Sequence, residues 1–367
     1  MLKREFKLLS NPGIMNAPIY KGGEQPSSTD IKIIKLNSNE NPFGPSKLAI
    51  EALRKSLDFI NIYPSSNHEK LRKAIANVHN INFENIICGA GSDELISFIC
   101  QCFCSPKDEV IYTEHGFAMY RISALLRGAI PIKVQESDRV ADVDNILKKC
   151  NYKTKIVFLA NPNNPTGTFL DTSKIKYLLD NLPENILIVI DGAYAEYVEN
   201  FDAGLSFVKN YNNLIILRTF SKIYGLASLR IGWSYSSNRI SKIINQVRGP
   251  FNISSPAIAA ATAAVLDADY IRHCHVKNLK NREWLSRELK NLGLSTTNSK
   301  ANFLLVDFCS ELQANKAFDF LKNHNIYVRK VIDYGLKQSL RITVGTDIEC
   351  KLVKKNIQKF LGLDNEI

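Results

Sequence analysis

The chain has 367 residues, of which 45% are hydrophobic and 23% charged, which is ordinary for a folded globular protein and long enough for two domains. No apolar run approaches the roughly 20 residues that cross a bilayer, and no long apolar segment follows the basic N-terminus, so we expect neither a membrane protein nor a secreted one. The formal net charge is +11, but the lysines are spread out and form no basic stripe that interleaves aromatic residues. This argues against nucleic-acid binding and leaves the attraction of anionic substrates as a use for the charge.

The start of the chain, residues 1–45, is expected to be an irregular arm. Asn11-Pro12-Gly13, Gly22-Gly23 and Asn41-Pro42-Phe43-Gly44-Pro45 are clusters of residues that interrupt helices and strands. Apolar residues at helical spacing follow from about Ser46, which predicts the first helix there.

Short apolar runs that are typical of buried strands then alternate with helical patterns. The runs are 86–88, 110–112, 156–159, 186–190 and 214–217. Continuous apolar runs between helices indicate an α/β fold, a mostly parallel sheet with helices on both faces. We predict this larger domain over residues 46–255.

The pattern changes after residue 255. A helical stretch spans 256–292, and the apolar runs 303–306, 326–328 and 340–342 surround a helix near 311–323. This mixture predicts a smaller α+β domain over residues 256–367.

The cysteines and histidines do not indicate a metal site. The eight cysteines are scattered through apolar segments, as expected for reduced thiols in a cytoplasmic protein. The tightest cluster is His273-Cys274-His275, which lies in a helical pattern where alternate residues do not share a face.

Lys222 is the leading candidate for a catalytic residue. It lies shortly after the apolar run 214–217, and two hydroxyls and an arginine lie near it in sequence: Thr219, Ser221 and Arg230. The amine of a lysine can form a Schiff base with an aldehyde cofactor, while the hydroxyls and the arginine hold a phosphate. A single lysine after a strand is more often a solvated surface charge, so this hypothesis depends on the rest of the chain.

Polar residues follow other predicted strands as well. Residues 89–94 (GAGSDE) precede a helical pattern, so their backbone N–H groups form either a phosphate cradle or an ordinary helix cap. Residues 161–167 (NPNNPTG) read as a turn in which Asn164 could also donate its amide to a cofactor oxygen. Ligands of open α/β sheets bind beyond the carboxyl ends of the strands, where these segments are expected to meet.

Asp191 ends the apolar run 186–190. A buried carboxylate costs free energy unless it has a partner, and the protonated ring nitrogen of a cofactor would be such a partner. A cationic ring would then withdraw electrons from a substrate carbanion. Tyr194 follows closely and could reach the phenolic oxygen of the same ring. Helix capping is the competing explanation for Asp191.

Together these motifs closely resemble the fold-type I pyridoxal-phosphate aminotransferases, and among them the histidinol-phosphate aminotransferase group. The resemblance covers nearly the whole chain. The matching stretches are 36–45 (LNSNENPFGP), 63–64 (YP), 89–94 (GAGSDE), 161–167 (NPNNPTG), 219–225 (TFSKIYG) with Arg230, and 340–345 (LRITVG).

The resemblance implies pyridoxal 5'-phosphate as the cofactor and gives the candidate residues their roles. Lys222 would bind the cofactor and move a proton, and Asp191 would pair with the ring nitrogen. Tyr194 and Asn164 would contact the phenolic oxygen, and Phe117 would stack on the ring. The residues implied to hold the phosphate are Ala90, Gly91, Ser92, Thr219, Ser221 and Arg230.

The implied reaction is the transamination of histidinol phosphate with 2-oxoglutarate, giving imidazole-acetol phosphate and glutamate, as in histidine biosynthesis. An aromatic aminotransferase and, less closely, a threonine-phosphate decarboxylase are similar and remain as alternatives. Arg341 would hold a carboxylate or phosphate of the substrate, with Asn164, Arg329 and Tyr20 as further contacts. Tyr63 would reach the cofactor phosphate of a neighbouring subunit, so the resemblance implies a homodimer that acts on small molecules.

Two segments depart from the family pattern. Gly192 stands where the family often has glutamate, a residue not expected to touch the cofactor. Residues 18–23 (PIYKGG) differ from the usual substrate segment, which weakens the role implied for Tyr20. Lys222 and Asp191 are both present, which argues against a non-catalytic regulatory domain.

Overall fold

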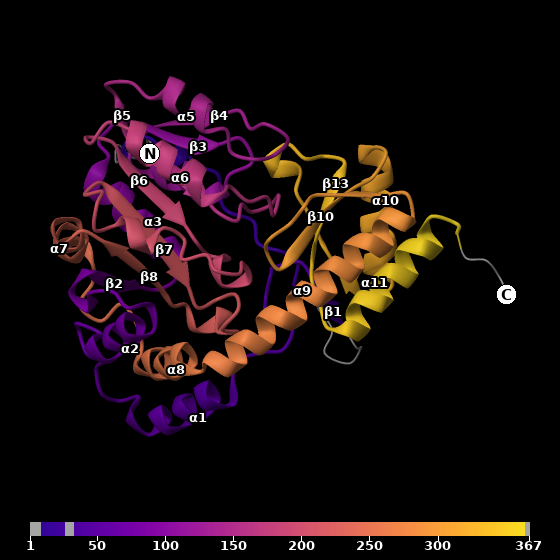
Figure 1. The fold of residues 1–367 in the computed structure, drawn as a ribbon, viewed down its shortest axis with the longest axis horizontal. Helices are drawn as coiled ribbons and strands as arrows, with labels where there is room; N and C mark the ends of the chain where they lie inside the picture. The colour runs from indigo at the N-terminus through magenta and orange to yellow at the C-terminus, as the bar shows by residue number, and fades with distance from the viewer. Residues whose placement is uncertain (1–8, 26–32, 364–367) are drawn as a thin grey trace, which may run out of the picture.

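The computed structural model describes residues 9–25 and 33–363. Its larger domain is built around a seven-stranded sheet with the strand order β2-β8-β7-β6-β5-β3-β4 (Figure 1). The strands in chain order are β2 (Ile86–Gly89), β3 (Glu109–Thr113), β4 (Ile130–Val134), β5 (Thr154–Ala160), β6 (Leu187–Asp191), β7 (Leu214–Thr219) and β8 (Gly232–Ser236).

Neighbouring strands of this sheet pair in parallel, except where β8 lies antiparallel between β2 and β7. The predicted mostly parallel sheet is therefore confirmed. Strands β4 and β8 were not among the predicted strands. Both interrupt their apolar residues with polar ones or with proline, so neither forms a continuous apolar run.

Helices cover both faces of the sheet, as predicted. One hydrophobic core includes residues of α1 (Lys47–Ser56), α2 (Glu69–His79), α5 (Val143–Lys149), α6 (Thr172–Asn181) and α8 (Ser255–Leu266). The core on the opposite face includes residues of α3 (Ser92–Phe103), α4 (Ala118–Leu126) and α7 (Asn238–Val247). Ser46 caps the first helix by accepting a hydrogen bond from the backbone N–H of Ala49, where the sequence predicted this helix to begin.

The smaller domain has its own antiparallel sheet, with the order β12-β13-β10-β9, and its own core. These strands are β9 (Ser295–Thr296), β10 (Phe303–Asp307), β12 (Arg329–Lys330) and β13 (Ser339–Thr343), accompanied by α10 (Glu311–Asn323) and α11 (Asp347–Phe360). The predicted α+β character is confirmed.

The N-terminal arm adds β1 (Ile34–Lys35), which pairs in parallel with β11 (Ile326–Tyr327) of the smaller domain. Residues 1–8 and 26–32 of the predicted arm lie outside the described residues.

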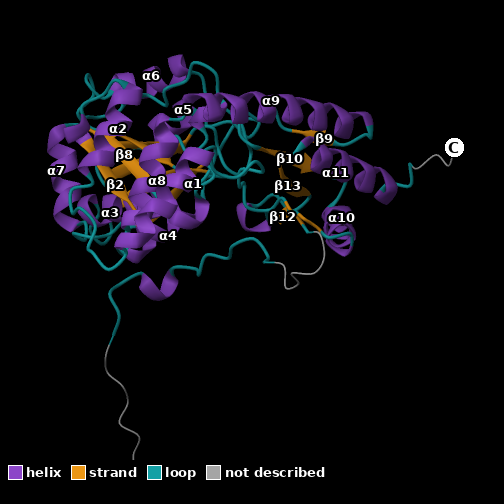
Figure 2. Cartoon of the chain, turned by 90° about the horizontal axis from the view of Figure 1, so that it is seen from below, coloured by secondary structure: helices purple, strands orange, loops and turns teal. Residues whose placement is uncertain are grey.

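The predicted helical stretch 256–292 consists of two helices. Asp267 separates α8 from α9 (Ala268–Asn291) and caps α9 by accepting a hydrogen bond from Tyr270 N at 3.2 Å. Helix α9 runs from the larger domain into the smaller one (Figures 1 and 2), and it contributes Cys274 to the first core and Leu285 to the second. The domain boundary at residue 256 remains a prediction, and this packing favours a boundary within α9.

In the described part of the chain, no helix is both long enough and apolar enough to span a membrane.

The short 3-10 helices include η4 (Ala195–Tyr197) and η6 (Ala227–Leu229), which lie in the loops after β6 and β7. These two loops carry several of the residues that the sequence singled out.

Candidate active site

A cavity of about 350 Å³ lies between the two domains, at the carboxyl ends of β5, β6 and β7. Most of the predicted site residues line it. They are Tyr20, Ser92, Phe117, Asn164, Asp191, Tyr194, Thr219, Ser221, Lys222, Arg230, Arg329 and Arg341. Ala90, Gly91 and Tyr63 do not line the cavity in this single chain. The structure thus brings together side chains that are far apart in sequence, while their chemical roles remain predictions.

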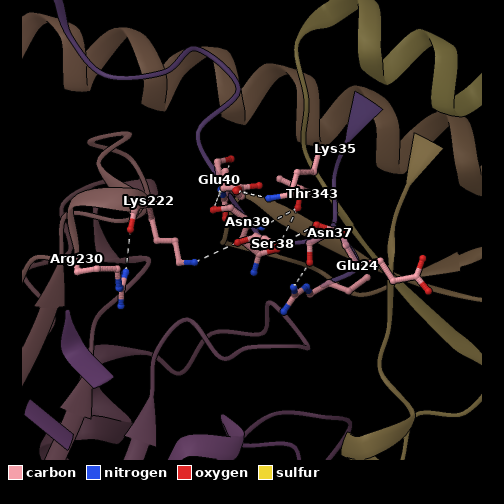
Figure 3. A network of polar contacts seen from close by, with 12 residues as sticks. Glu24, Lys35, Asn37, Ser38, Asn39, Glu40, Lys222, Arg230 and Thr343 are labelled. Carbon is pink, nitrogen blue, oxygen red and sulfur yellow. Dashed lines mark hydrogen bonds and ion pairs between the residues drawn. The ribbon is translucent and has the colours of Figure 1, made fainter. Parts of the chain in front are cut away.

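Lys222 lies in the cavity, in the loop that follows β7. Its Nζ donates a hydrogen bond to the carbonyl of Ser38 at 3.3 Å and lies 5.7 Å from the centre of the Tyr194 ring (Figure 3). Burial, and next the positive charge of Arg341, lowers the pKa of Lys222 to about 8. A larger fraction of this amine is therefore neutral and nucleophilic near neutral pH than of a solvated lysine.

Asp191 ends β6, the strand beside β7, and pairs in register with Leu217. Its two oxygens accept hydrogen bonds from the Tyr120 hydroxyl at 2.7 Å and from Ala193 N at 3.1 Å. Burial raises the pKa of Asp191 to about 6, although the hydrogen bond from Tyr120 opposes the rise. No cation among the described residues forms an ion pair with this carboxylate.

Tyr194 is buried three residues beyond Asp191, and its hydroxyl accepts a hydrogen bond from Asn39 Nδ2 at 2.9 Å. Asn39 is in turn held by the smaller domain, because its backbone N–H donates to Thr343 Oγ1 at 3.0 Å (Figure 3). Burial raises the pKa of Tyr194 to about 12, so the phenol is a hydrogen-bond donor at neutral pH. The donor capacity of Tyr194 is consistent with the predicted contact to a phenolic oxygen.

The residues predicted to hold a phosphate converge at the N-terminus of α3. Gly91 is the N-cap residue at φ 87°, and no side chain caps the helix there, so its first N–H groups can bind an anion. Arg230 Nη1 lies 3.2 Å from Ser221 Oγ, and Arg230 Nη2 lies 3.2 Å from Asp93 Oδ2. The positive φ of residue 91 favours glycine, and a Cβ there would also lie 2.4 Å from Arg230 Nη2, so the arginine would have to move.

Arg341, on β13, is buried and forms no ion pair among the described residues. It donates to Asn164 Oδ1 at 2.5 Å and to the carbonyl of Asn37 at 2.9 Å, and its Nε is buried without a partner in the described structure. Burial lowers the pKa of Arg341. Because Asn164 accepts through its oxygen, its Nδ2 remains available as a donor to a cofactor or substrate.

Arg329 and Tyr20 lie at the edge of the same cavity. Arg329 donates to the backbone carbonyls of Gly22 and Lys21, the latter at 2.5 Å, and so holds the arm across the opening. The ring of Tyr20 packs edge-on against Phe117, with 6.0 Å between the ring centres. Despite the departure in sequence at 18–23, the structure places Tyr20 against the residue predicted to stack on the cofactor.

Tyr63 lies outside the cavity and is 80% exposed, with its ring stacked on Phe251 at 4.6 Å. Several neighbours are also large, apolar and exposed: Leu57, Phe59, Ile60 and Ile62. The described chain therefore does not place Tyr63 near its own Lys222.

The glycine that departs from the family pattern has a steric explanation here. A Cβ on Gly192 would lie 2.7 Å from the Cβ of Ala203 and 3.1 Å from the Cδ of Arg218. Arg218 is buried and forms an ion pair with Glu196 at 2.9 Å. The space beside residue 192 is thus filled by these neighbours, neither of which lines the cavity.

Tyr120 and Asn39 are among the residues of this site that were not assigned roles from the sequence. Tyr120 bonds Asp191, and Asn39 bonds Tyr194, yet both come from segments distant in the chain. One turn of α4 separates Tyr120 from Phe117, so helical spacing alone could have placed it near the site. Asn39 lies within the stretch 36–45 that carried the resemblance, although nothing local indicated its partner.

These features fit a planar, phosphorylated aldehyde. The cavity offers a buried amine, a carboxylate that lacks a cationic partner, a phenol donor and an uncapped helix N-terminus beside an arginine. Each of these groups matches one part of pyridoxal phosphate: its aldehyde, ring nitrogen, phenolic oxygen and phosphate.

Comparison with known proteins agrees with this geometry. Residues 31–357 match the sequence model of the family described as aminotransferase class I and II. A histidinol-phosphate aminotransferase of Ruegeria sp. (strain TM1040) is 49% identical over 354 residues, which cover 96% of this chain and 98% of that protein. One of Paracoccus denitrificans (strain Pd 1222) is 42% identical, with 99% and 98% covered.

A solved structure also resembles this chain closely. The crystal structure of histidinol-phosphate aminotransferase from Sinorhizobium meliloti, in complex with pyridoxal-5'-phosphate, superposes with a TM-score of 0.86 at 28% identity. The match covers 90% of this chain and 92% of that one.

Proposed function

This chain belongs to the aminotransferase class I and II family, and we propose that it transfers the amino group of histidinol phosphate to 2-oxoglutarate, giving imidazole-acetol phosphate and glutamate. The family predicted from the sequence motifs is thereby confirmed. Curated relatives of 42% to 49% identity that carry the name histidinol-phosphate aminotransferase support this substrate and a place in histidine biosynthesis.

Pyridoxal phosphate is the proposed cofactor, and when bound it supplies an electron-withdrawing ring that stabilises negative charge on the substrate Cα. Lys222 would hold the cofactor at its aldehyde carbon, and its amine is the base that would accept the proton from the substrate Cα. Asp191 would keep the ring nitrogen protonated. Tyr194 and Asn164 would donate hydrogen bonds to the phenolic oxygen, and Phe117 would limit the tilt of the ring.

The observation that carries the substrate proposal is the position of Arg341. It is buried in the same cavity as Lys222, and within the described residues its acceptors are neutral and its Nε has no partner. A guanidinium in this state is a site for an anionic group of the substrate, because its fork binds carboxylate or phosphate through two hydrogen bonds. Arg329 adds a second positive charge. Glutamate offers a carboxylate and histidinol phosphate a phosphate, so the two substrates can use Arg341 in turn.

We also propose that the active form is a homodimer in which Tyr63 serves the neighbouring subunit. The exposed large apolar residues that lie near Tyr63 in the chain support this, because apolar side chains left in water favour association. The cytoplasmic location predicted from the sequence remains a prediction.

A steady-state assay tests the reaction. Protein loaded with pyridoxal phosphate should form glutamate from 2-oxoglutarate when histidinol phosphate is present, and it should form none when histidinol replaces it without the phosphate at the same concentration. Equal rates with the two donors would contradict the proposed use of the arginines. Phenylalanine in the same assay tests the aromatic aminotransferase, and the release of CO2 from threonine phosphate, measured separately, tests the decarboxylase.

A further inference from the structure

The proposed reaction requires one cavity to accept an imidazole ring from one substrate and a second carboxylate from the other. We propose that Glu40 accepts the imidazole N–H of histidinol phosphate, and that Lys35 neutralises Glu40 so that glutamate is not repelled. This specificity role rests on the proposed function and concerns side chains that the sequence motifs left without a role.

Glu40 ends the short segment 38–40, and the two residues before it contact Lys222 and Tyr194. Two residues before it, the carbonyl of Ser38 accepts a hydrogen bond from Lys222 Nζ at 3.3 Å, and one residue before it, Asn39 bonds Tyr194. Both Glu40 and Lys35 line the cavity, and Lys35 Nζ lies 2.5 Å from Glu40 Oε1 (Figure 3). The pair is therefore beside the place where Lys222 acts.

The backbone of this segment is fixed, so the Glu40 side chain starts from a defined position. Asn302 Nδ2 donates to the carbonyl of Asn39 at 3.0 Å and lies 3.4 Å from that of Glu40. Thr343 accepts from the N–H of Asn39 at 3.0 Å. Recognition by hydrogen bonding needs such rigid support.

The other carboxylates that line the cavity already have other uses. Asp191 is held by Tyr120 and Ala193, and Asp93 pairs with Arg230 at the phosphate cradle. Glu40 uses Oε1 for Lys35, whereas its Oε2 has no hydrogen bond within the described structure, and its side chain is 39% exposed. It thus offers a charged acceptor to an N–H group in the cavity.

The ion pair with Lys35 explains how the part of the cavity beside Glu40 can also bind a dicarboxylate. An isolated carboxylate would repel the second carboxylate of glutamate, since like charges brought together disfavour binding. With Lys35 beside it, this part of the cavity offers an acceptor to imidazole and a cation to glutamate. Glu40 therefore favours the binding of histidinol phosphate, and Lys35 favours the binding of glutamate.

Two unreactive ligands separate these effects: glutarate, which is glutamate without its amino group, and the analogue of histidinol phosphate that lacks the amino group. Calorimetry with the pyridoxal-phosphate-loaded protein would give both Kd values. Glu40→Gln should weaken the imidazole ligand by roughly 10- to 100-fold relative to glutarate, the usual effect of losing a hydrogen bond to a charged group. Lys35→Met should change the ratio of the two Kd values in the opposite direction, because it should weaken the binding of glutarate more than the binding of the imidazole ligand.

The control is Glu69→Gln, which removes the carboxylate of the exposed Lys73–Glu69 pair on α2 and should leave the ratio unchanged. Equal weakening of both ligands by Glu40→Gln, or no change in the ratio with either cavity variant, would overturn this role. If Glu40→Gln does not fold, the Lys35→Met ratio decides alone. Failure of the unmodified protein to bind the imidazole ligand would instead contradict the proposed function itself.

Discussion

The hydroxyl of Tyr120 donates a 2.7 Å hydrogen bond to the buried carboxylate of Asp191. The Tyr120 ring is itself fixed, since it stacks on Phe158 with 4.7 Å between ring centres and 2° between planes. Asp191 is therefore held in place by α4 as well as by its own strand. A carboxylate fixed in this way presents a stable partner to a protonated ring nitrogen.

Replacing Tyr120 with phenylalanine removes this hydrogen bond and keeps the ring that packs on Phe158. Because a buried charged acceptor loses its donor, the free energy of unfolding of the cofactor-free protein should fall by about 1–3 kcal/mol. Urea denaturation at neutral pH measures this change. The affinity for pyridoxal phosphate should fall as well, and a variant that matches the unmodified protein in both properties would contradict the role of Tyr120.

Replacing Asp191 with asparagine should change how stability depends on pH. Burial raises the pKa of Asp191 from 3.8 to about 6, so the folded cofactor-free protein binds a proton more tightly than the unfolded chain does. The stabilisation from that proton is present below about pH 4 and is lost as pH rises through about 6. The shift of about two units corresponds to about 3 kcal/mol.

Urea denaturation of the two cofactor-free proteins between pH 4 and 7 tests this expectation. The free energy of unfolding of the Asp191→Asn variant should rise relative to the unmodified protein as pH increases, and the difference should level off near pH 7. Parallel pH profiles would show that Asp191 is not protonated in the folded protein in this range. With pyridoxal phosphate bound, the order should reverse, because only the aspartate pairs with the ring nitrogen.

The reactivity of Lys222 should depend on pH with a midpoint near 8. Burial and the charge of Arg341 lower its pKa to that value, and only the neutral amine attacks an aldehyde. The rate of covalent attachment of pyridoxal phosphate to cofactor-free protein should rise through about pH 8 and then level off. Borohydride reduction followed by mass spectrometry should locate the cofactor on Lys222, and Lys222→Ala should lose this modification. A midpoint above 10 would contradict the buried environment.

Arg341→Lys keeps the charge but loses the planar fork that binds Asn164 and an anion together. We expect kcat/KM for glutamate to fall by roughly 10- to 100-fold, as for the loss of one charge-assisted hydrogen bond. The absorption of bound pyridoxal phosphate should be retained, because Arg341 is not expected to hold the cofactor. An unchanged kcat/KM would exclude Arg341 as the anion site.

Tyr63 can be tested by mixing two inactive variants. If Tyr63 acts on the neighbouring subunit, a heterodimer of Tyr63→Ala and Lys222→Ala has one site that contains both Tyr63 and Lys222. Activity should therefore appear after the two variants are mixed and allowed to exchange subunits, while each alone remains impaired. No recovery in a mixture proven to contain heterodimers would contradict action in trans.

The sequence predicted the parts of this site that depend on strand ends. Asp191, Lys222 and Asn164 each follow a continuous apolar run, and the carboxyl ends of parallel strands necessarily meet at one edge of the sheet. The position of the proposed phosphate cradle, at the N-terminus of α3, was expected for the same reason. These predictions needed only local patterns and the general geometry of α/β sheets.

Contacts between distant segments could not be predicted in this way. The bond between Tyr120 and Asp191 depends on how α4 packs against the sheet, and the bond between Asn39 and Tyr194 depends on the path of the arm between the domains. The break between α8 and α9 was also missed, because the alanine-rich segment before Asp267 and the charged segment after it both carry helical patterns. Strand β8 was missed because its serines are buried between neighbours rather than exposed.

The central claim is that this site accepts histidinol phosphate as its amino donor. A single-turnover experiment tests it most directly: the protein loaded with pyridoxal phosphate is mixed with one donor and no 2-oxoglutarate, and the loss of the pyridoxal phosphate absorption band is followed. We expect faster loss with histidinol phosphate than with phenylalanine or threonine phosphate at equal concentrations. Faster loss with phenylalanine, or no loss with histidinol phosphate, would contradict it.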